Sequence, residues 1–333
     1  MNNLEGSAET FFAIIAASKL KLFDLLQIPH TLEGIKRAYP YPDLIQPLIL
    51  ILIKAGLIEE IKGKFYCSLL AGEFLSIQSP YSQIQFLEKQ LWHLTDLWAD
   101  LPDILMNGPR LYDEEEFFAT RSLPSMAANA LTGRLQDITS EVSRLPRFAS
   151  CRKMIDLGGG HGLYALALAK RNPGLQAVVF DHPQVIPLAR ETISRYGMEK
   201  QVTTVGGDFF IDSFGSEYDI IFSSSNPSGK TISMLPVIES SLNPGGYFIN
   251  IQSGDKKVDE DPRVQLEWEL WSFQGVDAPK SSWGKKKGFF TEEYRDALIR
   301  SGFDIISVSS IPDPYIKGFS VTMVIAEKRN MFT

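Results

Sequence analysis

A glycine-rich segment in the middle of the chain, residues 154–162 (Met-Ile-Asp-Leu-Gly-Gly-Gly-His-Gly), constrains the fold more than any other feature. Its apolar residues predict a buried strand, and its glycines predict a turn that opens a helix over 163–170. Glycines let the backbone approach a ligand closely, and the amides of a helix start point toward it. Because Leu163 is not a glycine, the dinucleotide spacing G-x-G-x-x-G is absent. We therefore expect a different cofactor, held by Gly158, Gly159 and Gly160. Asp156, two residues before Gly158, suits a cofactor with an amino acid end.

Acidic residues follow the next two apolar segments. Residues 177–180 predict a strand that ends at Asp181, about 20 residues after the glycines, where a carboxylate can accept both hydroxyls of a ribose. A third strand is predicted over 202–210, and within it Asp208 and Phe209 could take the amino group and the face of an adenine. The alternative for Asp181 is a solvated strand end, and for the glycine turn a bend without a ligand.

Two more strands complete this pattern. One is predicted over 218–223, followed by Ser224, and the other over 247–251, after the turn Asn243-Pro244-Gly245-Gly246. We expect the strand ends to converge on one pocket, where Ser223 and Ser224 could contact the cofactor or simply end a strand. His161 and His182 stand beside the cofactor motifs, and we expect them to face solvent or pack on the edge of the ligand.

Together these motifs resemble the class I S-adenosylmethionine-dependent methyltransferases. The resemblance extends to small-molecule O-methyltransferases with an amino-terminal winged-helix dimerisation domain, such as hydroxyindole and caffeate O-methyltransferases, because residues 284–303 are similar to their carboxy-terminal helix and turn. It covers most of the 333 residues. It implies an α/β, Rossmann-like domain with a mostly parallel seven-stranded sheet and an antiparallel edge strand near 321–327. It also implies S-adenosylmethionine as cofactor, S-adenosylhomocysteine as product, and a homodimer.

The same resemblance divides the chain into three parts: a mainly α winged-helix dimerisation domain over 1–100, a helical connector and substrate lid over 101–147, and the methyltransferase domain over 148–333. The amino-terminal sequence agrees, since helices are expected over 11–17, 19–26, 31–38 and 42–55, followed by a hairpin over 57–67.

A role for the winged helix in binding DNA is disfavoured by charge. The net charge is −7 and the isoelectric point is about 5.3, whereas phosphate binding needs a basic surface. The would-be recognition helix, residues 44–54 of the expected fourth helix, carries one basic residue and is apolar on nearly every face, which suits a protein interface or core. The longest apolar stretch, residues 48–53, is too short to span a membrane. Two cysteines and no export signal fit a cytoplasmic protein.

Aromatic residues mark the expected acceptor pocket. Trp92 and His93 lie in the predicted helical region over 79–147, and the resemblance places Met126 and Asn129 in the lid over the substrate. Trp268 and Trp271 follow the fifth strand, where the family has a helix that lines the pocket. Core packing alone would also explain these aromatics.

The catalytic residues of the family are missing. Its O-methyltransferases use a histidine after the fourth strand, steadied by two carboxylates; the corresponding positions fall near Ser228, at Gln252 and near Gly288. The usual general base is therefore absent. Asn226, Ser228 and Gln252 are candidates for polar positioning groups, and His93 is a candidate substitute base.

From these observations we expect methyl transfer from S-adenosylmethionine to a small, aromatic or conjugated molecule. Without a base, the acceptor could be a thiol, an acidic enol or phenol, or an activated carbon. Transfer to oxygen, carbon, nitrogen or sulfur stays open. Two other classes also stay open, namely a cofactor-binding homologue with non-methylating chemistry and a DNA-binding regulator. No cluster with metal-ligand spacing is apparent.

Overall fold

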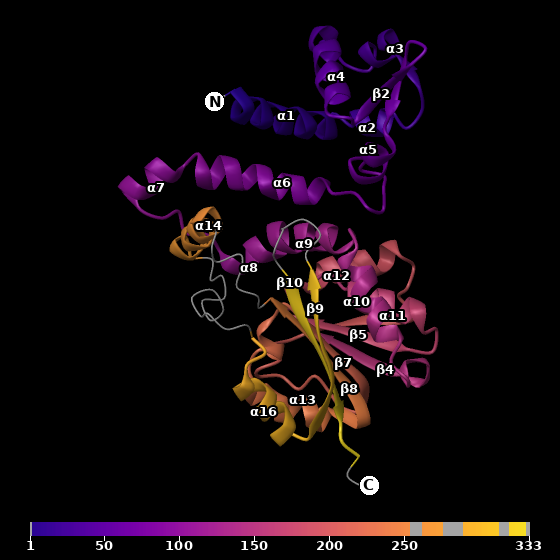
Figure 1. Ribbon diagram of the computed structural model, residues 1–333, viewed down its shortest axis with the longest axis vertical. Coiled ribbons are helices and arrows are strands. Elements are labelled where there is room, and N and C mark those ends of the chain that lie inside the picture. Colours follow the sequence, from indigo (N-terminus) through magenta and orange to yellow (C-terminus); the bar gives the residue numbers. More distant parts are fainter. Residues whose placement is uncertain (1, 254–261, 276–288, 313–319, 331–333) are drawn as a thin grey trace. The chain divides into compact units, whose positions relative to one another are not determined.

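The computed structural model describes residues 2–253, 262–275, 289–312 and 320–330, and the chain folds into two compact units (Figure 1). One unit comprises residues 1–103 and 124–129, and the other comprises 104–123 and 130–333. The division of the chain at residues 100 and 147 stays a prediction.

The amino-terminal unit begins with helices and a small sheet in winged-helix order. Its elements to residue 98 are α1 (Asn2–Lys19), α2 (Leu22–Leu25), β1 (His30–Thr31), α3 (Leu32–Lys36), η1 (Pro42–Leu44), α4 (Ile45–Lys54), β2 (Ile58–Ile61), β3 (Lys64–Cys67), α5 (Leu69–Phe74), α6 (Ile84–Trp92) and the π-helix η2 (His93–Trp98). The three strands pair in the order β1-β3-β2, all antiparallel. The hairpin turns at Lys62 and Gly63, whose φ angles of 52° and 75° are those of a tight two-residue turn.

One face of α4 packs into the core of this unit. Ile49 and Leu52 are almost fully buried, together with Phe23 of α2. On the same helix Leu50 is 56% exposed and Ile51 is 40% exposed. An apolar helix that leaves such residues in solvent suits a contact with another protein surface.

Helices connect the small sheet to the large one, as the sequence predicts. They are α7 (Leu101–Asn107), α8 (Glu114–Phe117), the π-helix η3 (Phe118–Ser122), α9 (Leu123–Ala130) and α10 (Arg134–Ser143). Helix α7 ends before Gly108, whose φ of 94° is typical of a glycine that follows a helix.

The second unit is built on a seven-stranded sheet in the order β6-β5-β4-β7-β8-β10-β9. Its strands are β4 (Lys153–Leu157), β5 (Gln176–Asp181), β6 (Val202–Gly206), β7 (Tyr218–Ser224), β8 (Leu242–Ser253), β9 (Phe303–Pro312) and β10 (Ser320–Lys328). Neighbours pair in parallel except at β10, which is antiparallel to both β8 and β9. The seven-stranded α/β prediction is confirmed.

Two details of the prediction are wrong. The antiparallel strand at 320–328 is not at the edge, because β9 forms a hairpin with it and lies outside it. The third strand ends at Gly206 rather than 210, because Asp208 accepts a hydrogen bond from the backbone N–H of Phe210 and turns the chain there.

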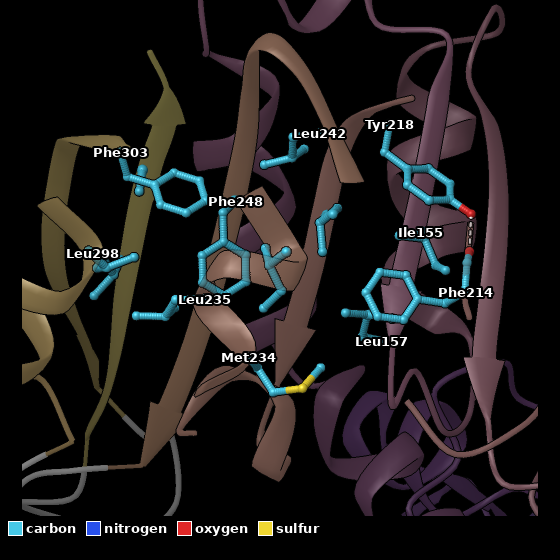
Figure 2. Packing of buried hydrophobic residues seen from close by; sticks show 14 of the residues in the cluster. Ile155, Leu157, Phe214, Tyr218, Met234, Leu235, Leu242, Phe248, Leu298 and Phe303 are labelled. Atoms are coloured by element: carbon cyan, nitrogen blue, oxygen red, sulfur yellow. Dashed lines mark hydrogen bonds between the residues drawn. The ribbon is translucent and has the colours of Figure 1, made fainter. Parts of the chain in front are cut away.

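Helices cover both faces of the sheet: α10, α11 (Leu163–Arg171) and α12 (Ile186–Arg195) lie on one side, and α13 (Leu235–Ser241) and α16 (Glu292–Arg300) on the other (Figure 1). Figure 2 shows the core beneath α13 and α16, where the ring centroids of Phe248 and Phe303 are 6.0 Å apart. In the same view the Tyr218 hydroxyl donates to the carbonyl of Phe214 over 2.6 Å, so that the buried phenol is satisfied.

Candidate functional site

The glycine turn joins β4 to α11 at the carboxyl end of the parallel strands. Gly158, Gly160 and Gly162 have φ angles of 63°, 53° and 74°, which residues other than glycine rarely adopt. The N–H of Gly158 donates to the carbonyl of Phe180 over 2.8 Å, which ties the turn to β5. This conformation explains why the sequence places glycines at alternate positions.

Close packing also requires glycine here. A Cβ atom on Gly158 would lie 2.8 Å from the side chain of Asn226, and one on Gly159 would lie 2.8 Å from that of Asp156. The turn is therefore held against two of the predicted site residues.

Asp181 links the end of β5 to the turn. Its Oδ2 accepts the N–H of Gly160 over 2.8 Å, and its Oδ1 accepts the N–H of His182 over 2.7 Å. Burial raises the pKa of this carboxyl, while the hydrogen bonds from Gly160 and His182 oppose that rise. A carboxylate has about four acceptor positions, so that two remain for the hydroxyls of a ligand.

Asp156 is almost fully buried beneath the turn. It is 1% exposed, and its Oδ2 has no hydrogen-bond partner. Burial, reinforced by the charge of Asp181, raises the pKa of Asp156 well above its usual value, against a hydrogen bond from the backbone of Ala165. Because an orphaned buried acceptor is costly, it marks a place where a donor is expected.

The other predicted cofactor residues lie at neighbouring strand ends. Asp208 and Phe209 follow β6, and Phe209 packs against the core. His182 is exposed, Ser224 is half-buried, and Ser223 is completely buried. The expectation for His161 is wrong in part: it is 7% exposed and does not face solvent, because its Nδ1 accepts the N–H of Leu163 over 3.1 Å. Burial lowers the pKa of His161 to about 4.

A buried polar network surrounds Ser228, the position at which the resemblance predicts the catalytic histidine of the family. It joins the end of β7, the 3-10 helix η5 (Pro227–Gly229), β8 and α16, and its members are Ser223, Asn226, Ser228, Asn250, Gln252 and Tyr294. Below, these six residues are called the polar network. Ser223, Ser228, Asn250 and Gln252 each have zero exposure.

Asn226 connects this network to the glycine turn. Its Nδ2 donates to the carbonyl of Leu157 over 2.7 Å, and its Oδ1 accepts from the Ser228 backbone N–H over 3.0 Å. Gln252 donates to the carbonyl of Asn226 over 3.1 Å, and its Oε1 is buried without a partner. The structure thus brings three of the four predicted catalytic candidates together.

The backbone of Gly229 lies inside the network. Its carbonyl accepts from Asn250 Nδ2 over 2.6 Å and from the Tyr294 hydroxyl. Sequence reasoning missed Asn250 and Tyr294; the available signal was an asparagine within an otherwise apolar strand.

The predicted acceptor-pocket residues fall in different units. In the first unit Trp92 and His93 are buried, and their ring centroids are 5.6 Å apart. The same unit contains Asn129 and Met126, of which Met126 is 39% exposed. In the second unit Trp271 packs on Phe117 at 4.8 Å between centroids. Trp268 belongs to α14 (Pro262–Phe273), but its side chain, like Gly288, lies outside the described residues.

Comparison with known proteins identifies the family. Residues 123–303 match the O-methyltransferase domain model. The chain belongs to this family of S-adenosylmethionine-dependent methyltransferases. It is 30% identical over 313 residues to an uncharacterized protein of Methanocaldococcus jannaschii, covering 91% of this chain and 83% of that one. It is 29% identical over 282 residues to human acetylserotonin O-methyltransferase, and the match covers 78% of this chain and 80% of the human enzyme.

Solved structures of family members share the fold. An O-methyltransferase family protein from Burkholderia thailandensis aligns with a TM-score of 0.70 at 21% identity, covering 98% of this chain and 97% of that one. Human N-acetylserotonin methyltransferase, solved in complex with S-adenosylmethionine, aligns with a TM-score of 0.62 at 22% identity. The alignment covers 99% of this chain and 96% of the human chain. Among the described residues of this chain, no helix has the length and apolar character to cross a membrane.

Proposed function

We propose that this protein binds S-adenosylmethionine at the glycine turn and transfers its methyl group to a small, aromatic or conjugated molecule. The observation that carries the proposal is the pair of carboxylates at adjacent strand ends, Asp156 with an orphaned oxygen and Asp181 with free acceptor positions. They flank a turn whose glycines are required by conformation and packing.

These residues fit the chemical ends of that cofactor. Asp156 offers a buried anionic or neutral acceptor toward an ammonium group, and Asp181 offers acceptors to a ribose diol. Asp208 and Phe209, at the next strand end, would take the adenine, with His182, Ser223 and Ser224 as further candidates. When bound, S-adenosylmethionine supplies an electrophilic methyl group on a sulfonium sulfur.

The protein's contribution would be alignment rather than proton removal. The turn is fixed through Gly158, Asn226 and Asp181, which restricts where a bound donor can sit. Orientation of two reactants can supply several kcal/mol toward the barrier. Ser228, Asn226 and Gln252 contribute here by rigidity, since their hydrogen bonds run to one another, to other members of the polar network and to the backbone.

The residues that we propose to contact the methyl-accepting molecule are Trp92, His93, Met126, Asn129, Trp268 and Trp271. Acceptor oxygen is favoured, because the family is that of O-methyltransferases and the human relative is by name an O-methyltransferase. A homodimer formed through the amino-terminal unit is part of the proposal, supported by the exposed apolar residues Leu50 and Ile51 on α4.

Calorimetry and label transfer test this proposal. Titration of S-adenosylhomocysteine into the protein should show saturable binding, and methyl-labelled S-adenosylmethionine with a panel of phenols, enols and thiols should yield a labelled small-molecule product. No binding of either cofactor form at millimolar concentration would overturn it. Binding with a changed substrate mass but no label would instead support non-methylating chemistry.

A further inference from the structure

One acceptor atom of the polar network lacks a partner, namely Oε1 of Gln252. Nε2 of Gln252 uses both of its protons, because it donates to the carbonyl of Asn226 over 3.1 Å and to Oδ1 of Asn250 over 2.9 Å. Nδ2 of Asn250 donates in turn to the carbonyl of Gly229 and to the Tyr294 hydroxyl, so the amide of Asn250 cannot be flipped. The orientation of the Gln252 amide is therefore fixed, and its oxygen faces away from these partners.

The rest of the network is satisfied. In the part of the chain that the structure describes, the side-chain nitrogens and oxygens of Ser223, Asn226, Ser228, Asn250 and Tyr294 all have hydrogen-bond partners. Oε1 of Gln252 has none, although its side chain has zero exposure. A buried acceptor without a donor is unfavourable, so its presence in an otherwise complete network indicates a place for a ligand that donates.

The strand register places Gln252 at the level of the glycine turn. Leu157, Ser223 and Asn250 are paired in one row across the parallel strands β4, β7 and β8. Gln252 lies two residues beyond Asn250, just as Gly159 lies two residues beyond Leu157. Because β8 is two strands away from β4, the orphaned oxygen belongs to the same edge of the sheet, about 10 Å along it from the turn.

The order of the strands separates this position from the one proposed for the cofactor. The adenine, the ribose and the amino acid end of S-adenosylmethionine are assigned above to Asp208, Asp181 and Asp156, which follow or end β6, β5 and β4. The end of β8 lies on the opposite side of β4, beyond β7. A molecule in contact with Gln252 would therefore lie beside the amino acid end of the cofactor, on the side that β6 and β5 leave open to a methyl acceptor.

The surroundings of this oxygen favour a neutral donor. An oxyanion would be repelled by an amide oxygen. An ammonium group would lack a counter-charge, because the network consists of amides, aliphatic hydroxyls and the phenol of Tyr294, whose pKa is raised by burial against a hydrogen bond from Asn250. A neutral O–H or N–H satisfies the oxygen without either cost. A hydroxyl held there keeps its proton, so it is not the group that receives the methyl.

We infer that Gln252 selects a bifunctional methyl acceptor, a small aromatic molecule whose neutral N–H or O–H donates to Oε1 of Gln252 while a second group receives the methyl. This inference rests on the proposed function and specifies its substrate class. Gln252 contacts the substrate and acts by recognition, and no proton is transferred at its amide. An amide at the position where the resemblance predicts a carboxylate keeps the acceptor oxygen and removes the charge.

Indole and benzofuran are matched probes, because they have nearly the same size and shape and only indole has an N–H. Their binding is measured by equilibrium dialysis, with and without S-adenosylhomocysteine. The variants are Gln252→Met, which has no acceptor oxygen, and Gln252→Glu, whose carboxyl keeps one while burial holds it protonated. The control is Gln136→Met, which changes an exposed glutamine of the same unit.

We expect the wild-type protein to bind indole about tenfold more tightly than benzofuran, the scale of one hydrogen bond to an otherwise unsatisfied buried acceptor. Gln252→Met should bind the two probes equally, whereas Gln252→Glu and Gln136→Met should keep the preference for indole. The ratio of the two affinities separates recognition from support of the fold, because a merely structural role would lower both affinities alike.

A measurement on the wild-type protein does not depend on the folding of Gln252→Met. Glutamine is labelled with carbon-13 at the side-chain carbonyl, and the resonance of Gln252 is identified as the one missing from the spectrum of Gln252→Glu. This resonance should shift on addition of indole and stay in place on addition of benzofuran.

Three results would overturn the inference: no saturable binding of indole to the wild-type protein, equal affinity of the wild-type protein for the two probes, or an unchanged preference for indole in Gln252→Met. Binding of S-adenosylhomocysteine is measured separately by calorimetry. Its failure to bind, with the preference for indole intact, would count against the proposed function and not against recognition by Gln252.

Discussion

The backbone N–H of Gly160 donates to Oδ2 of Asp181 over 2.8 Å, and this bond ties the glycine turn to the end of the neighbouring strand. One carboxylate thus fixes the shape of the turn and keeps acceptor positions for a ligand. Under the proposed function, the shape of the turn and the recognition of the cofactor would therefore depend on the same side chain.

Replacement of Asp181 by Asn should weaken cofactor binding. An amide offers one acceptor oxygen instead of two, so either Gly160 or His182 loses its partner, at a cost of about 1–3 kcal/mol. The affinity for S-adenosylhomocysteine, measured by calorimetry, should fall by tenfold or more. The control is Asp296→Asn, which changes an exposed carboxylate on α16 and should bind as the wild type does. Equal affinity in Asp181→Asn would remove Asp181 from the cofactor site.

Asp156 should make stability depend on pH. Its pKa in the folded protein is raised by burial and by Asp181, whereas the unfolded chain ionises near the usual value of 3.8. Below pH 3.8 the carboxyl is protonated in both the folded and the unfolded protein, so it does not lower the free energy of unfolding. As the pH rises from 3.8 toward the pKa in the folded protein, the unfolded chain ionises first and the free energy of unfolding decreases. Asp156→Asn removes this loss. Urea unfolding from pH 5 to pH 8 should show that the free energy of unfolding of the variant, relative to wild type, increases with pH.

The same variant should also lose affinity for the cofactor, because the amide cannot provide a carboxylate at the orphaned Oδ2 position. A gain in stability with a loss of binding is typical of a functional site held under strain. Parallel pH profiles for the two proteins would contradict the burial argument.

The sequence predicted the parallel sheet and the glycine turn between β4 and α11 because strand period, glycine position and terminal acids are local signals. It could not predict that β9 lies outside β10, since the order of strands in a sheet depends on contacts between distant segments such as Phe303 and Phe248. Asn250 and Tyr294 were missed for the same reason: only the fold shows which polar side chains are buried and which of them have partners.

His161 should contribute stability that is lost in acid. Its pKa falls from 6.5 to about 4 on folding, so the unfolded chain binds a proton in this interval that the folded protein excludes. The contribution is present above pH 6.5 and declines as the pH falls toward 4, by about 3 kcal/mol in all. His161→Gln should flatten this part of the pH profile of unfolding. The imidazole nitrogen-15 shifts should meanwhile report a neutral ring at pH 5.5, and a charged ring there would refute the assignment.

Substitution of Gly229 by Ala should disrupt the polar network. An added Cβ would meet Asn250 Oδ1, Gln252 Nε2 at 2.6 Å and Ser223 Oγ at 2.7 Å, all of them side chains with zero exposure. Since Gly229 is not among the residues with positive φ, the effect is steric. Overpacking of this kind costs about 1–3 kcal/mol, which urea unfolding should detect.

The matched control for that variant is Gly6→Ala, because Gly6 lies in α1 with nothing within 4 Å of its added Cβ. There the alanine should be neutral or stabilise by up to about 1 kcal/mol. Because Asn226 of the network also donates to the carbonyl of Leu157 just before the glycine turn, Gly229→Ala should weaken binding of S-adenosylhomocysteine, whereas Gly6→Ala should leave it unchanged. Unchanged affinity for S-adenosylhomocysteine in a destabilised Gly229→Ala would mean that the network supports the packing of the unit and has no separate role in positioning the glycine turn.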